Sequence, residues 1–186
     1  MGQKSLSGRA VAGGWPTAST GRMTAFLAVS AVVPAPGGSF VSSMPAPNRW
    51  ILSAAMRLAG TRPPAKALRR GLGTGLGDEV VDRVVAEFTP ESPRLYRDRT
   101  GDRAWDGRGG FLSTTLDAQM PTALQRRFAE QLGAEWTEEI ATGHLPMLQD
   151  PPATAAAIDR FLNPGVTPSC RRSPDSTRSP GAPGPR

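Results

Sequence analysis

The sequence predicts an α/β fold in which a mostly parallel sheet is flanked by helices. A continuous apolar run, Phe26–Val33, is followed by PAPGG and is typical of a strand buried on both faces of a parallel sheet, although a short helix fits the pattern too. From Gly109 onward, the pattern alternates between strand and helix. Such alternation implies βαβ crossovers and therefore parallel strands.

The alternating part contains two predicted strands with a helix between them. GFLSTTLD is rich in β-branched and apolar residues, which favours a strand, and EWTEEIATG suits a short edge strand. Between them, Pro121 stands where a proline opens a helix, and Gly133 stands where a glycine ends one. Apolar residues at helical spacing fill this stretch: Leu124, Phe128 and Leu132.

A last helix is expected after Asp150, which is a good N-cap residue, with Pro151 in the first helical position. Its predicted apolar stripe is Ile158, Phe161 and Leu162. After Asn163 the chain is too rich in Pro, Ser and Gly to bury a core, so we expect a disordered basic tail over 163–186. Residues 1–22 show no period and are expected to be irregular.

The stretch from Ser42 to Asp106 predicts helices separated by breakers, which would cover another part of the protein. NRWILSAAMRLAG is expected to be a helix that ends at Gly60 and buries one face, formed by Trp50, Ile51, Ala54, Ala55 and Leu58. A second helix is expected to start with Asp78 as its N-cap and to end before Pro90, with Val80, Val81, Val84, Val85 and Phe88 on one face.

The glycine run RRGLGTGLGDE lies between these two helices and has the composition of a phosphate loop. It has neither the G-x-G-x-x-G spacing nor a following G-K-[ST]. We therefore interpret it as a flexible connection between helices.

The charge and cysteine content exclude several classes of protein. The net charge of +6 arises partly in the tail, and the basic runs have no interleaved aromatic residues, so we expect no specific nucleic-acid partner. A basic nucleic-acid-binding protein stays as an alternative, and it would bind with a steep salt dependence. Cys170 is the single cysteine, which excludes an intrachain disulfide, and one Cys with one His cannot supply the usual zinc ligands.

The apolar run Met23–Ala35 is too short to cross a bilayer, which requires ~20 apolar residues. It follows a basic region and so has some character of a signal peptide, but a buried strand fits it better. We expect a cytoplasmic protein with no membrane partner.

Asp117 and His144 are the residues with the strongest catalytic pattern. Ligands of open α/β sheets bind beyond the carboxyl ends of the strands. Asp117 ends GFLSTTLD, and His144, the single histidine, follows EWTEEIATG. A carboxylate that accepts a hydrogen bond from imidazole Nδ1 leaves Nε2 able to take a proton. Each residue alone also has a structural interpretation, as a turn residue or a loop histidine.

Several segments resemble the α/β-hydrolase superfamily, in particular small esterases related to plant methylesterases and hydroxynitrile lyases. GHLPMLQDP resembles the histidine loop, and FLSTTLDAQMPTALQRRFAEQLGAE resembles the strand, acid and helix before it. FLAVSAVVPAPGGSF is similar to the strand and loop that follow the nucleophile helix. The resemblance covers residues 23–162 and places a helical cap at about 43–105, but the amino-terminal strands of the fold have no counterpart.

The resemblance implies that His144 is a general base and that Asp117 orients it, with no metal or organic cofactor. Asp102 and Asp106 are weaker alternatives for the acid because they precede the strand. The nucleophile is missing, since no serine stands in a G-x-S-x-G elbow. The serines considered and rejected are Ser19, Ser30, Ser39, Ser42 and Ser43.

The sequence therefore predicts a protein of carboxylic ester hydrolase lineage that uses a Ser-His-Asp mechanism but lacks the serine. Its expected substrate is a small-molecule ester. The alternative is a catalytically inactive, truncated remnant or a non-enzymatic binding protein. An incomplete sheet would expose an unpaired edge, which favours self-association.

Overall fold

A computed structural model describes residues 24–101 and 107–165 of the chain. Three strands form one sheet in the order β1 (Ala25–Val29), β2 (Arg108–Thr114) and β3 (Trp136–Ile140), and both neighbouring pairs are parallel. The predicted parallel α/β sheet is thereby confirmed. The apolar run forms a shorter strand than expected, because β1 ends at Val29 and Ser30 has a positive φ of 42°.

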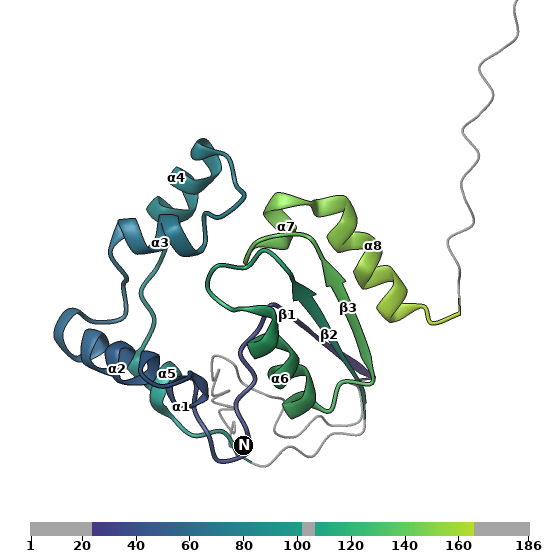
Figure 1. The fold of residues 1–186 in the computed structure, drawn as a ribbon, viewed down its shortest axis with the longest axis horizontal. Helices are drawn as coiled ribbons and strands as arrows, with labels where there is room; N and C mark the ends of the chain where they lie inside the picture. The colour runs from purple at the N-terminus through teal and green to yellow at the C-terminus, as the bar shows by residue number, and fades with distance from the viewer. Residues whose placement is uncertain (1–23, 102–106, 166–186) are drawn as a thin grey trace, which may run out of the picture.

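Helices cover both faces of this sheet, as Figure 1 shows. Helix α6 (Thr122–Leu132) packs on one face, where Phe111 of β2 and Phe128 of α6 belong to one buried cluster. Helix α8 (Pro151–Leu162) packs on the other face, where Leu112 and Ala157 share a second cluster. Successive residues of β2 thus face opposite layers, as the pleat of a strand requires.

The predicted ends of these two helices are confirmed. Gly133 follows α6 in the left-handed conformation, with φ 68° and ψ 38°, and Pro121 lies just before its first residue. The Asp150 side chain caps α8 by accepting a hydrogen bond from the backbone N–H of Ala153, with Pro151 at the first position. The expected stripe of α8 is wrong at Leu162, which is exposed, whereas Phe161 is buried.

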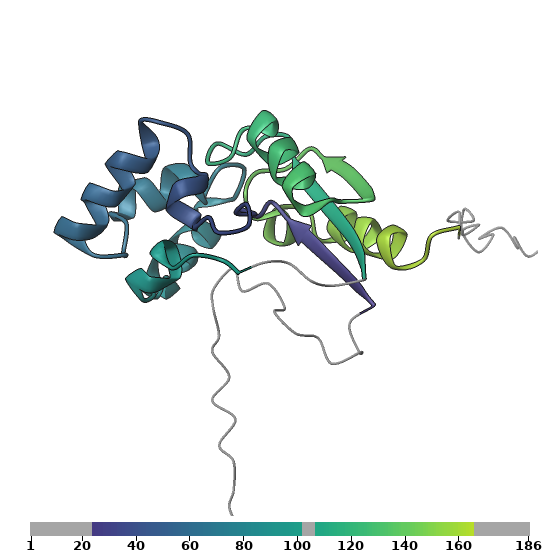
Figure 2. The same cartoon turned by 90° about the horizontal axis from the view of Figure 1, so that it is seen from below.

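Among the described residues, five helices lie between β1 and β2, where helices and breakers were predicted. They gather to one side of the sheet in Figures 1 and 2. They are α1 (Phe40–Ser43), α2 (Asn48–Ala59), α3 (Ala65–Gly71), α4 (Asp78–Glu87) and α5 (Pro93–Arg97). A further short helix, α7 (Pro146–Gln149), precedes α8. The sequence pattern predicted α2 and α4 but none of the short helices.

The predicted buried face of α2 is wrong. Trp50 and Ile51 are each 63% exposed and Leu58 is 89% exposed, while Met56 is buried. The helix is turned so that Leu52 and Met56 line a pocket, while Trp50, Ile51 and Leu58 lie at the surface. In α4, Val81 is buried as predicted, but the N-cap is Gly77, and Asp78 is the first helical residue.

Some predictions lie outside the described residues. They concern residues 1–22, nearly all of the tail 163–186 including Cys170, and the alternative acids Asp102 and Asp106. Among the described helices, none is long and apolar enough to cross a membrane.

Candidate active site

Asp117 and His144 meet beyond the carboxyl ends of β2 and β3. Asp117 follows β2 by three residues, and His144 follows β3 by four. Because the two strands are parallel neighbours, these loops leave the sheet at the same edge. Imidazole Nδ1 of His144 lies 2.7 Å from Oδ2 of Asp117. The two residues singled out in the sequence are therefore in direct contact.

The Asp117 carboxylate is fully buried and accepts hydrogen bonds at both oxygens. The backbone N–H groups of Gln119 and Met120 donate to Oδ1 at 2.7 and 3.0 Å. The Ser30 hydroxyl donates to Oδ2 at 2.7 Å, beside His144. With donors on both oxygens, the carboxylate has one fixed orientation toward the imidazole.

These partners keep Asp117 ionised. Burial raises the pKa of a carboxyl group, but the hydrogen bonds from His144 and Ser30, the attraction of the imidazole and the Gln119 N–H outweigh it. The pKa of Asp117 is therefore below its ordinary value. An ionised carboxylate can only accept hydrogen bonds, so the proton in this contact belongs to Nδ1 of His144.

Gln125 of α6 holds the loop that carries Asp117. Its fully buried amide accepts a hydrogen bond from the Thr114 N–H at 3.0 Å and donates to the carbonyls of Thr114 at 2.8 Å and Met120 at 2.7 Å. Gln125 was not among the site residues predicted from the sequence. A signal was present, because Gln125 stands three residues before Phe128 and therefore shares the buried face of the helix.

The histidine loop is held by the connection between α3 and α4, which is the glycine run of the sequence. A Cβ atom at Gly143 would collide with the Thr74 carbonyl oxygen, so the residue before His144 must be glycine for this approach. The Gly143 N–H donates to Oε1 of Gln149 at 2.6 Å. The run was predicted to connect α2 to α4. Its first three residues instead end α3, which was not predicted, and the rest connects α3 to α4 and packs against the candidate site.

Ser30 lies in the site although no residue pattern around it predicts this position. It follows β1 directly, and its Oγ is 3.3 Å from Nδ1 of His144. This is the imidazole nitrogen that Asp117 holds, so Ser30 contacts the Asp117 side of the ring. A nucleophile would have to stand at Nε2. Ser30 therefore does not fill the position of the missing nucleophile.

An apolar pocket of about 540 Å³ adjoins the pair, and both Ser30 and His144 line it. Its apolar walls come from the helical block and include Leu52, Met56 and Leu68. Tyr96 also lines this pocket. Burial, and to a smaller extent the negative charge of Glu91, raise the pKa of its phenol, so its hydroxyl stays neutral. A pocket with apolar walls and a few polar groups is typical of sites for small organic molecules.

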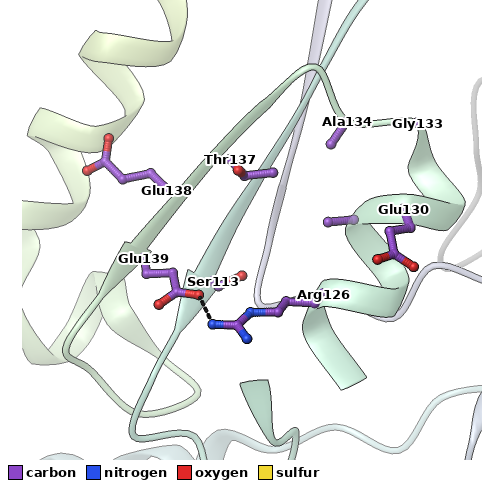
Figure 3. A pocket seen from close by; sticks show the side chains of 9 residues that line it. Ser113, Arg126, Glu130, Gly133, Ala134, Thr137, Glu138 and Glu139 are labelled. Carbon is purple, nitrogen blue, oxygen red and sulfur yellow. Dashed lines mark hydrogen bonds and ion pairs between the residues drawn. The ribbon is translucent and has the colours of Figure 1, made fainter. Parts of the chain in front are cut away.

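A second hollow of about 500 Å³ lies between α6 and β3 (Figure 3). It is lined by charged and small residues, and Arg126 forms an ion pair with Glu139 at 3.1 Å inside it. Neither Asp117 nor His144 lines this hollow. Within the described part of the chain, no group of three or more His, Cys, Asp or Glu side chains has a geometry that could hold a metal ion.

Comparison with solved structures identifies the architecture. An extracellular α/β-hydrolase from a Paenibacillus species, described as sharing homology with tobacco Salicylic Acid Binding Protein 2, superposes with a TM-score of 0.65 at 15% identity. The match covers 75% of this chain and 62% of that chain. Polyneuridine aldehyde esterase matches over the same shares, with a TM-score of 0.56 at 14% identity. This chain has a partial α/β-hydrolase fold.

A variant of tomato methylketone synthase I in complex with β-ketoheptanoate shares the α/β-hydrolase fold, with a TM-score of 0.52 at 12% identity. The match covers 74% of this chain and 59% of the synthase. The chain thus spans less than two thirds of these α/β-hydrolase-fold structures. No protein-family model matches it, and no curated protein does either.

Proposed function

We propose that the chain carries the base and acid of a carboxylic ester hydrolase site of the Ser-His-Asp type. His144 is the general base, and Asp117 orients it. The observation that carries this proposal is the 2.7 Å contact between Nδ1 and Oδ2 at the wall of an apolar pocket. The α/β-hydrolase fold, shared with proteins described as an esterase and a hydrolase, supports it.

The chemistry follows from the tautomer of His144. Asp117 holds the proton on Nδ1, so Nε2 is free to take the proton of a serine hydroxyl as that oxygen attacks the ester carbonyl. No serine of this sequence stands in the elbow motif that presents such a nucleophile, so the steps that follow require a serine placed at Nε2. The same proton then passes to the leaving alcohol, and water hydrolyses the acyl-serine in a second round. The pocket would accept the apolar part of a small ester, and no cofactor enters these steps.

A second function, ligand binding without turnover, is favoured by one observation. None of the serines in the 186 residues stands in a G-x-S-x-G motif, and Ser30 contacts the wrong side of the imidazole for attack. A protein with this pocket but without a nucleophile would bind a small apolar ester and leave it intact. The cytoplasmic location stays a prediction, and one similar structure is described as extracellular.

Hydrolysis of p-nitrophenyl acetate and butyrate separates the two functions. The enzyme proposal expects turnover above the buffer rate that falls roughly 10²- to 10⁴-fold in His144→Ala, the usual contribution of a general base. Arg126→Ala, in the hollow between α6 and β3, is the control and should leave the rate unchanged. A rate indifferent to His144→Ala would overturn the enzyme proposal.

Binding of the same esters tests the alternative. Leu52→Arg places a charge in the pocket wall and should abolish saturable binding measured by calorimetry. Binding that is lost in Leu52→Arg, without His144-dependent hydrolysis, would establish the binding function. If the wild-type chain neither binds nor hydrolyses these esters, both proposals fail for this substrate class.

A further inference from the structure

A line of buried polar side chains leads to Asp117, and its last member, Ser30, lies beside His144. Gln125 Nε2 lies 3.4 Å from Thr114 Oγ1, Thr114 Oγ1 lies 3.0 Å from Ser30 Oγ, and Ser30 Oγ lies 2.7 Å from Asp117 Oδ2. Gln125 and Thr114 are 0% exposed and Ser30 is 6% exposed. Three elements, α6, β2 and the end of β1, contribute to this line.

The direction of each hydrogen bond follows from what its groups can donate. The Thr114 N–H can only donate, so the Gln125 oxygen faces it and the Gln125 amide nitrogen faces Thr114 Oγ1. The ionised Asp117 can only accept, so Ser30 gives it its proton. The Thr114 hydroxyl then donates to Ser30 at 3.0 Å, with Asp117 Oδ2 itself 3.4 Å away. The hydroxyl protons of Thr114 and Ser30 therefore point toward the carboxylate, whereas the two Gln125 N–H groups donate to the carbonyls of Thr114 and Met120.

The backbone at Ser30 is held in a conformation that non-glycine residues rarely adopt, with φ 42°. Its N–H donates to the Leu112 carbonyl at 2.9 Å, which anchors it to β2, and its Oγ reaches Asp117. Strained residues of this kind concentrate at functional sites, where the surrounding structure enforces them. A serine that only ended a strand would not need this conformation.

We propose that Ser30 and Thr114 are positioning residues that form a one-directional hydrogen-bond relay from the Thr114 hydroxyl to Asp117, next to the Gln125 amide that holds Thr114 in place. The relay donates a hydrogen bond to Asp117 Oδ2 and so fixes the carboxylate in the orientation in which it accepts the hydrogen bond from Nδ1–H of His144. Thr114 acts on His144 through Ser30 and Asp117, whereas Ser30 also lies 3.3 Å from Nδ1 of His144. The proposal rests on the proposed function for the use of this arrangement, but the tautomer of His144 can be measured whether or not an ester is hydrolysed.

The test is nitrogen-15 NMR of the imidazole, which is unambiguous because His144 is the single histidine. At about pH 9, where an ordinary histidine is neutral, the wild-type protein should show the Nδ1–H tautomer. Loss of one relay hydroxyl in Ser30→Ala or Thr114→Val removes a hydrogen bond that orients the carboxylate and should lower the ratio of Nδ1–H to Nε2–H roughly three- to tenfold. Thr114→Ser retains the hydroxyl and should restore the wild-type ratio.

Two controls separate a relay from a general loss of structure. Thr142→Val makes the same change at a buried threonine whose hydroxyl has no hydrogen-bond partner among the described residues. Ser43→Ala removes a buried hydroxyl that bonds the Ser39 carbonyl, in helix α1. Both should keep the wild-type ratio. An unchanged ratio in Ser30→Ala and Thr114→Val, or an equal change in the controls, would overturn the relay. Absence of ester hydrolysis would overturn the proposed function alone.

Discussion

Asp117 is the residue on which the candidate site depends most, because it joins the loops after β2 and β3 and the end of β1. Replacement by Asn keeps the shape but removes the charge that His144 and Ser30 contact. Since hydrogen bonds to charged groups are the stronger ones, we expect Asp117→Asn to lower the free energy of unfolding at pH 7 by roughly 1–3 kcal/mol. Chemical denaturation measures this loss.

The pH dependence of this loss has a defined sign. The pKa of Asp117 in the folded protein is below its ordinary value of 3.8, so the unfolded chain binds a proton more readily. The contribution of Asp117 is fully present above that ordinary value and is lost as the pH falls through the folded-state pKa. The stabilities of wild type and Asp117→Asn should therefore converge in this acid range. If the stability curves of wild type and Asp117→Asn stay parallel through this acid range, the assignment is contradicted.

Asp117 and His144 could be predicted from the sequence, whereas Ser30 could not, and the difference has a physical reason. Asp117 and His144 each follow a strand closely, and parallel strands bring such positions together regardless of the details of packing. Ser30 lies 84 residues from Thr114 and 87 from Asp117, and its role depends on a backbone angle and on hydrogen bonds across this distance. Local patterns of residue type contain no information about such contacts.

At the scale of elements, helix ends could be predicted better than helix faces. Caps depend on a few adjacent residues, so Gly133 and Asp150 were recognisable. The buried face of α2 depends on its partners, and there the amphipathic pattern gave the wrong side, with Trp50 at the surface. The shortest helices carry too few residues for a periodic pattern, so α1, α3, α5 and α7 were missed.

The cap of α8 provides a prediction at this scale. Asp150→Ala removes the acceptor of the Ala153 N–H, which lies 2.9 Å from Oδ1, and leaves this donor without its cap. The free energy of unfolding should fall by about 1 kcal/mol, the usual cost of losing an N-cap. Asp159→Ala, at an exposed position near the other end of the same helix, is the control. An acid there opposes the helix dipole, so its loss should be neutral or slightly stabilising.

At the scale of the whole molecule, the sheet has the parallel order expected from its crossovers, but its outer edge at β1 has no partner strand among the described residues. The Ser30 N–H donates to the Leu112 carbonyl of β2. Backbone N–H groups alternate in direction along a strand, so those of Ala25, Leu27 and Val29 point away from β2, toward the open edge of the sheet. Strand edges of this kind pair with other chains. The exposed apolar residues of α2 offer a second surface for association.

We predict that the purified chain self-associates through the edge of β1, which light scattering coupled to size exclusion can measure. Ala25→Pro removes an N–H that points away from β2 and leaves the hydrogen bonds between β1 and β2 in place. It should weaken association roughly tenfold, which corresponds to about 1.4 kcal/mol of binding free energy. Ile51→Lys charges the surface of α2 at a residue that is 63% exposed and should leave association unchanged. If Ile51→Lys weakens association and Ala25→Pro does not, the interface lies at α2. In that case the Ala25 N–H pairs with no other chain, so its loss has no effect. A chain that stays monomeric at all concentrations would contradict both surfaces.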